Sequence, residues 1–232
     1  MKERHYGKKG YLEAEMKSNL FSKRQIQKMY DRFSNIPWFW EIDAITCRAT
    51  ETSPYRAQAI SHLKLDSTSS VLDVACGTGL NFALIQNYLK NQGNLTGIDL
   101  SSKTLDLARK RISKQGWSNI QLIQTDSAEY KSEDTFDAVL CTFAIEIIPS
   151  YQDTIDMMIN AVKPGGRVAI IGFKMSSWNY FRWFNSFFKN ISVLFGGVDL
   201  NRNTRAYLCS QGREVFYNEV FGGYYYILVV QK

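Results

Sequence analysis

The sequence has 232 residues, 45% hydrophobic and 22% charged, which suits one ordinary globular domain with its own core. No apolar run reaches the roughly 18 residues of a membrane-spanning helix, and the polar N-terminus lacks the apolar stretch of a secretory signal, so we expect a cytoplasmic protein. The net charge of +6 is concentrated in residues 1–28 and 174–232, which is typical of a solvated surface or of attraction to an anionic substrate or membrane.

Helices and strands are predicted to alternate along most of the chain. Residues 18–64 look helical, with a break near Pro37 because the residue before a proline avoids the helical region. Residues 71–75 form a short apolar run that ends in a glycine loop, as a buried parallel strand does. Further strands are predicted over 94–99, 120–124, 136–143 and 167–173, and helices over 81–91, after Ser101 and over 151–162.

The C-terminal end follows a different pattern. Residues 214–221 and 224–230 are β-rich runs on either side of Gly222-Gly223, which predicts an antiparallel hairpin. The sequence therefore predicts an α/β fold with a mostly parallel sheet of seven strands, a C-terminal hairpin and helices on both faces. We expect one domain over 1–232, comprising a helical N-terminal cap (1–64), a core (68–174), a substrate-covering insertion (175–213) and the terminal hairpin (214–232).

The strongest local motif is the glycine loop after the first predicted strand. Gly77 and Gly79 form a strand–Gly-x-Gly–helix turn, which lets the backbone approach a ligand closely. A dinucleotide site requires a third glycine, but that position is Phe82, so NAD and FAD are disfavoured. Asp99 ends the next strand, where a carboxylate can accept hydrogen bonds from ribose hydroxyls, and Asp126 follows the third strand.

Together these motifs resemble the class I S-adenosylmethionine-dependent methyltransferases, which have a Rossmann-like fold. The resemblance covers about residues 68–174 through VLDVACGTG, GIDLS, TDS, FDAVLCTFAIEIIP and VKPGG, in that order. The subgroup it resembles most holds quinone C-methyltransferases and bacterial phospholipid N-methyltransferases. The implied cofactor is S-adenosylmethionine, and the residues that it implies for binding are Tyr30, Asp73, Ala75, Gly77, Gly79, Asp99, Leu100, Asp126, Ser127 and Thr142.

The resemblance also assigns roles to several of these residues. Asp73 would orient the methionine amino group, Asp99 would hold the ribose, and Leu100 would lie against the adenine. Asp126 and Ser127 would lie near the adenine edge. Tyr30 would close over the cofactor, with simple helix packing as the alternative interpretation.

Glu146 is the candidate catalytic residue. Many relatives have a histidine at the matching point, facing the transferred methyl, and Glu146 could bind a cationic amine there or act as a base. The alternative is an ordinary surface carboxylate. His5 and His62, the two histidines of the chain, are poorly placed to act as active-site bases.

Residues 178–195 carry aromatic side chains at helical spacing: Trp178, Phe181, Phe184, Phe188, Ile191 and Phe195. Three interpretations stay open. The segment could be a core-facing amphipathic helix, a cap over an apolar substrate, or a helix in a membrane interface that also offers Arg182 and Lys189.

We therefore expect methyl transfer by in-line displacement to a small, apolar or lipid-like acceptor, such as a lipid amine, a quinone or a secondary metabolite. The alternatives are a nucleic-acid methyltransferase and a non-catalytic subunit that binds S-adenosylmethionine. Base-modifying enzymes carry an Asp/Asn-Pro-Pro-aromatic tetrad after the fourth strand, whereas this chain has Cys141-Thr142-Phe143-Ala144, so no nucleic acid is expected. No metal is expected either.

Overall fold

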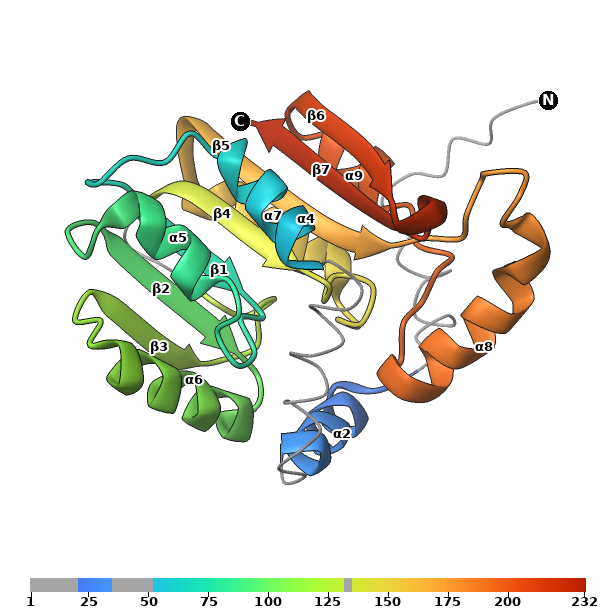
Figure 1. Ribbon diagram of the computed structural model, residues 1–232, viewed down its shortest axis with the longest axis horizontal. Coiled ribbons are helices and arrows are strands. Elements are labelled where there is room, and N and C mark those ends of the chain that lie inside the picture. The colour runs from blue at the N-terminus through green and yellow to red at the C-terminus, as the bar shows by residue number, and fades with distance from the viewer. Residues whose placement is uncertain (1–20, 35–51, 132–134) are drawn as a thin grey trace.

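The computed structural model describes residues 21–34, 52–131 and 135–232, which fold around one seven-stranded sheet (Figure 1). The strands are β1 (Ser70–Val74), β2 (Asn94–Asp99), β3 (Ile120–Gln124), β4 (Phe136–Thr142), β5 (Val162–Phe173), β6 (Arg213–Val220) and β7 (Tyr225–Gln231). They stand in the order β3-β2-β1-β4-β5-β7-β6. The pairs from β3 to β5 are parallel, and β7 runs antiparallel to β5 and β6. The predicted sheet and its C-terminal hairpin are confirmed.

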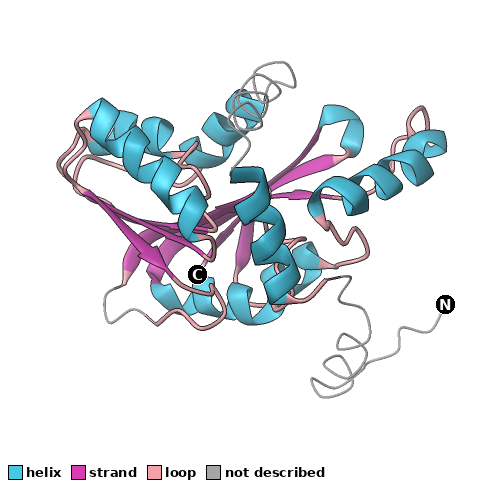
Figure 2. Ribbon diagram, turned by 90° about the horizontal axis from the view of Figure 1, so that it is seen from below, coloured by secondary structure: helices cyan, strands magenta, loops and turns pink. Residues whose placement is uncertain are grey.

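Helices cover both faces of this sheet (Figure 2). One face carries α4 (Thr52–Ser61), α5 (Phe82–Leu89) and α6 (Ser102–Gln115), and the other carries α7 (Tyr151–Ala161) and α9 (Thr204–Cys209). Successive strand residues alternate between the two apolar clusters, as Val71 and Leu72 do. Because both faces are covered, the central strands are apolar throughout rather than alternating.

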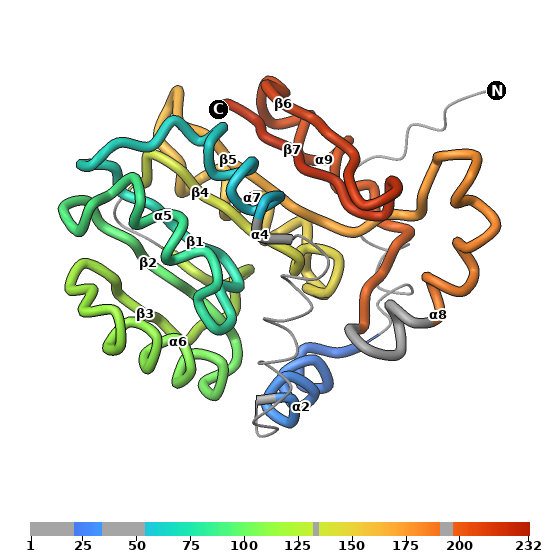
Figure 3. The backbone as a smooth tube through the Cα atoms, viewed as in Figure 1, coloured from blue at the N-terminus to red at the C-terminus, as the bar shows by residue number. Residues whose placement is uncertain are grey.

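Two further helices lie outside these layers, beyond the carboxyl ends of the central strands (Figure 3). They are α2 (Lys23–Ser34) and α8 (Asn185–Gly196). Ile26 of α2 and Phe188 of α8 belong to one small apolar cluster with Phe173, at the end of β5. Both helices therefore stand at the edge of the sheet where open α/β folds bind their ligands.

Most predicted boundaries agree with the structure to within one or two residues. Ser101 caps α6 as predicted, because its hydroxyl accepts a hydrogen bond from the Thr104 N–H at 3.3 Å. β5 begins earlier than expected, at Val162 instead of residue 167, because Val162 pairs with Phe136 of β4. The predicted break at Pro37 and the tail with His5 lie outside the described residues.

The predicted helix over 178–195 is wrong at its start. Residues 178–181 form a turn, followed by the 3₁₀ turn η1 (Arg182–Phe184) and then α8. The Tyr224 hydroxyl donates to the Phe181 carbonyl at 2.8 Å, which ties this stretch to the hairpin turn instead of to a helix. Within the described residues, no helix is both long and apolar enough to cross a bilayer.

Candidate active site

A cavity of about 340 Å³ lies at the carboxyl ends of β1 to β4, a size within the range of ligand clefts. Its walls are the loops that follow these strands, together with α2, one side chain of α4, Phe173 at the end of β5, and Val198. The predicted cofactor residues that line it are Tyr30, Ala75, Gly77, Asp99, Leu100, Asp126, Ser127 and Thr142. Asp73 and Gly79 are not among the lining residues. The topology thus brings together residues that are up to 112 positions apart.

The glycine loop presents bare backbone to the cavity. Gly77 has a φ of +55°, and a Cβ added there would meet no atom within 4 Å, so the space beside it is open to a ligand. Gly79 has a different role. A Cβ there would lie 2.5 Å from the ring of Phe82, a fully buried side chain that also fills the space beside Gly97. Phe82 thus occupies the region where a dinucleotide fold has its third glycine.

Asp99 is already a hydrogen-bond acceptor for the loops around it. Its carboxylate accepts from the Gly77 N–H at 2.8 Å, the Ser101 N–H at 2.9 Å and the Thr104 hydroxyl at 3.0 Å. Burial raises the pKa of Asp99. A carboxylate has about four acceptor positions, so Asp99 keeps acceptor capacity for a ligand at the cavity wall.

Helix α2 is fastened over the polar end of the cavity. The Ser101 hydroxyl donates to Asp31 at 2.6 Å, and Lys23 forms an ion pair with Asp126. Asp126 also accepts from the Ala128 N–H at 2.9 Å. Tyr30 lines the cavity from the same helix. A ligand that engages Asp126 would therefore share this carboxylate with Lys23.

A buried polar network lies behind the cavity. Asp73 is 0% exposed, and both of its carboxylate oxygens accept from the Asn81 amide at 3.0 Å. Burial raises the pKa of Asp73 to about 7, against the opposing effects of Asn81 and Arg56. Arg56 of α4 donates to the Asn81 side-chain oxygen at 2.8 Å and also to the Thr142 hydroxyl. Asp73 thus reaches the cavity through Asn81 and Thr142.

Arg56 is a lining residue that the sequence did not single out. It is 9% exposed, and its guanidinium carbon lies 4.9 Å from the centre of the Phe143 ring. The available signal was a lone arginine on the helix that precedes the glycine-loop strand. Its significance depended on contact with Thr142, 86 positions away, which local patterns do not reveal.

The other end of the cavity is apolar. Phe143 has a φ of +58°, a conformation that bulky side chains rarely adopt and that is typical of functional sites. Its ring lies 5.5 Å from the Phe173 ring, centre to centre, and 5.3 Å from that of Tyr225. Other apolar residues that line the cavity include Phe33, Ala144, Ile147 and Val198. This end suits an apolar molecule.

Glu146 lies in neither of the environments expected for it. It is 1% exposed and is not a lining residue, so it is not a surface carboxylate and it does not face the cavity. It accepts from the Phe173 N–H at 3.0 Å and the Tyr226 hydroxyl at 2.6 Å, and it also bonds the Thr204 hydroxyl. Burial raises the pKa of Glu146. Its contacts tie β5, β7 and α9 together behind the apolar end.

Neither His62 nor the two buried cysteines offer this cavity a base or a nucleophile, although Cys76 is among its lining residues. His62 stacks on Phe216 at 3.7 Å between ring centres, and burial lowers its pKa. Cys76 and Cys141 are buried and unpaired, and burial raises the pKa of both thiols. Thiols held in the protonated form are poor nucleophiles, so packing explains both residues better than catalysis does.

The comparisons with known proteins agree with this geometry. Residues 71–166 match the family described as a methyltransferase domain. The chain is 28% identical over 146 residues to a demethylmenaquinone methyltransferase of Listeria monocytogenes, a match that spans 61% of either protein. A demethylmenaquinone methyltransferase of Shouchella clausii is 25% identical over 174 residues, 74% of each chain.

Solved structures show the same fold at lower sequence identity. An N-methyltransferase from Bradyrhizobium japonicum, solved with S-adenosyl-l-homocysteine, superposes with a TM-score of 0.66 at 17% identity, over 89% of this chain and 98% of that one. A geranyl diphosphate C-methyltransferase from Streptomyces coelicolor gives a TM-score of 0.64 at 12% identity, over 78% and 80%.

Proposed function

We propose that this chain, a class I S-adenosylmethionine-dependent methyltransferase by its fold and its matching domain, methylates a small apolar acceptor. The observation that carries the proposal is the division of one cavity into two ends. Gly77 and Asp99 line it beside β1 and β2, at the polar end, whereas Phe143 and Phe173 line it beside β4 and β5, at the apolar end. A nucleoside-bearing cofactor suits the first, and an apolar acceptor suits the second.

The residues at the polar end fit S-adenosylmethionine. Gly77 leaves open space where the cofactor would pass close to the protein backbone, and Asp99 keeps acceptor capacity for a ribose hydroxyl. Ser127 and Asp126 line the part assigned to the adenine. The Thr142 hydroxyl accepts from Arg56 and from Asn81, so its own proton can be donated to the amino-acid end of the cofactor.

S-adenosylmethionine supplies a methyl group that is already activated on a sulfonium sulfur. The protein must therefore mainly align the acceptor with that methyl and exclude water, which can contribute several kcal/mol to catalysis. The tight ring contacts around Phe143 and the α2 cover over the polar end both serve this purpose.

Among the acceptors considered, a phenolic, quinol-like ring is favoured over a lipid amine. Among the described residues at the apolar end, Arg56 carries a charge. Its positive guanidinium would repel a cationic amine. A phenol that loses its proton to solvent water would place the negative charge of the phenolate beside this guanidinium, which favours the ionised form without a histidine base. The names of the demethylmenaquinone methyltransferase relatives support the same class of acceptor.

The test measures binding and transfer separately. Calorimetry should show binding of S-adenosylhomocysteine and none of NAD. Methyl-labelled S-adenosylmethionine is then offered with a short-chain demethylmenaquinol, phosphatidylethanolamine or RNA, and label should appear in the quinol. Arg56→Met should lower transfer more than Arg56→Lys, which keeps the charge. Failure to bind S-adenosylhomocysteine would refute the proposal, and binding without transfer to any acceptor would favour a non-catalytic subunit.

A further inference from the structure

Seven large apolar side chains are exposed in the described part of the chain, and all lie in one region, here named the aromatic surface. They are Met175, Trp178, Tyr180, Phe181, Trp183, Phe187 and Phe221. Tyr180 is 88% exposed and Trp183 is 80% exposed. Figure 3 shows that this segment and α8 project away from the sheet. Such a concentration of apolar side chains is typical of an interaction site.

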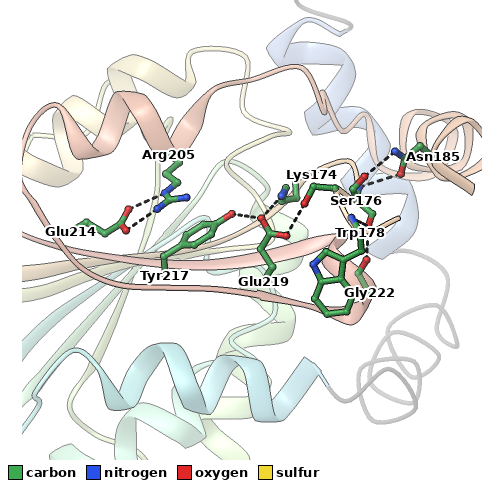
Figure 4. A network of polar contacts seen from close by, with 10 residues as sticks. Lys174, Ser176, Trp178, Asn185, Arg205, Glu214, Tyr217, Glu219 and Gly222 are labelled. Carbon is green, nitrogen blue, oxygen red and sulfur yellow. Dashed lines mark hydrogen bonds and ion pairs between the residues drawn. The ribbon is translucent and has the colours of Figure 1, made fainter. Parts of the chain in front are cut away.

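The aromatic surface is held firmly by polar contacts at its base (Figure 4). The Ser176 hydroxyl donates to the Gly222 carbonyl at 2.6 Å. The Asn185 side-chain amide donates to the Ser176 carbonyl at 3.0 Å and accepts from the Ser176 N–H at 3.1 Å. Lys174 pairs with Glu219 just before this point. The exposed rings therefore extend from a braced turn, so less order would have to be gained on binding.

The glycine pair of the hairpin makes this packing possible. A Cβ at Gly223 would lie 2.9 Å from the Ser176 hydroxyl oxygen and 3.1 Å from the Trp178 ring. A Cβ at Gly222 would lie 3.3 Å from the Phe181 ring. Both glycines also have positive φ values, +65° at Gly222 and +82° at Gly223. Because neither glycine has a side chain, the aromatic segment can pack directly against the hairpin turn.

The inner side of the segment reaches the wall of the cavity. Phe188 lies 4.2 Å from Tyr224, between ring centres, and belongs to the apolar cluster that contains Phe173 and Val198. Phe173 and Val198 line the cavity. The same segment therefore borders the apolar end on one side and exposes Tyr180 and Trp183 on the other.

The charge of this region is positive. Between Lys174 and Asp199 the sequence has no acidic residue, and Arg182 and Lys189 are both exposed there. Lys174 is neutralised by Glu219, but the described residues provide no ion pair for Arg182 or Lys189. Tryptophan and tyrosine beside free cations are the residues that suit a lipid–water interface, where one end of each ring is apolar and the other is hydrated.

We propose that the aromatic surface docks this chain on an anionic phospholipid membrane. Tyr180 and Trp183 enter the headgroup region, and Arg182 and Lys189 lie at the lipid phosphates. A membrane is a better occupant than a second copy of the chain, because the surface has cations at its edge and no acidic residue to pair with them. The link from this surface to the acceptor end of the cavity rests on the proposed function, but the docking itself does not.

The test is co-sedimentation of the full chain with phosphatidylcholine vesicles, with or without phosphatidylglycerol. Binding should require phosphatidylglycerol and fall in high salt, because screening shortens the attraction to about 3 Å at 1 M ionic strength. Arg182→Gln with Lys189→Gln should weaken it roughly 25-fold, at about a factor of five for each cation. The matched control, Lys110→Gln with Lys114→Gln on α6, removes two exposed cations at the other end of the sheet and should bind as the parent does.

A second measurement identifies the inserted rings. Lipids brominated in their acyl chains should quench the tryptophan fluorescence of the bound chain, and Trp183→Phe should lose most of this quenching while still binding. Tyr180→Ser with Trp183→Ser should abolish sedimentation and leave calorimetric binding of S-adenosylhomocysteine unchanged, which separates this proposal from the proposed function. Absence of vesicle binding, an equal loss in the α6 control, or a dimer that dissociates in the Tyr180/Trp183 variant without vesicle binding would overturn it.

Discussion

Replacement of Asp99 by alanine perturbs both the fold around the cavity and the proposed ribose contact. In the structure the carboxylate accepts three internal hydrogen bonds, at 2.8, 2.9 and 3.0 Å. Alanine leaves the Gly77 N–H, the Ser101 N–H and the Thr104 hydroxyl without this acceptor. Because Asp99 is partly exposed, water can replace it, and we expect a loss of roughly 1–3 kcal/mol in unfolding free energy.

The effect on cofactor binding should be separable from this structural cost. Hydrogen bonds to a charged group contribute about 1.5–3 kcal/mol, so affinity for S-adenosylhomocysteine should fall roughly ten- to a hundredfold. Because burial raises the pKa of Asp99, the parent chain should also lose affinity on acidification, as the acceptor becomes protonated. The alanine variant should show a weaker dependence on pH.

Isothermal titration calorimetry gives the dissociation constant, and urea unfolding of the ligand-free chain gives the stability. Asp106→Ala is the matched control, because it removes one exposed carboxylate from α6, the helix that follows Asp99. The control should bind as the parent does. An unchanged dissociation constant in folded Asp99→Ala would show that the ribose is not held at this position.

Three further predictions concern other parts of the site. Gly77→Ala places a Cβ in the open space beside the loop, at a φ of +55°. Thermal unfolding should show a stability loss of about 1–2 kcal/mol, and calorimetry should show S-adenosylhomocysteine binding weakened roughly tenfold. Unchanged binding would contradict this prediction. Tyr226→Phe removes the 2.6 Å bond to Glu146 and should lower the unfolding free energy by about 1.5–3 kcal/mol in urea, whereas Tyr88→Phe should not. Because the pKa of Asp73 is raised to about 7 in the folded chain, proton binding by this carboxyl stabilises the fold at low pH. This contribution is lost as the pH rises from about 4 to about 7. Asp73→Asn should therefore gain up to ~3 kcal/mol relative to the parent between about pH 5 and pH 8, and parallel stability curves would refute this.

The sequence by itself determined the order of strands and helices along the chain and many of the residues at the cofactor end of the cavity. These features depend on local patterns: short apolar runs, a glycine loop, a capping serine and a glycine-pair turn. Parallel strands also place their carboxyl ends at one edge of the sheet, so Gly77, Asp99 and Asp126 could be assigned to one cavity without coordinates.

The tertiary structure alone decided where the remaining side chains lie. Arg56 lines the cavity because α4 packs against the sheet beside Thr142, and Glu146 is buried because Tyr226 and Phe173 surround it. Both outcomes depend on partners that are distant in the sequence, which no local period encodes.

The aromatic segment illustrates the same limit. Helical spacing placed Phe184 and Phe188 on one face with Trp178 and Phe181, but the hairpin turn holds residues 178–181 out of the helix. Phe184 and Phe188 therefore pack toward Tyr224, while Tyr180 and Trp183 remain exposed. Which rings face outward was set by contacts with a turn about forty residues further along the chain, because a side chain is buried only where another part of the fold comes to cover it.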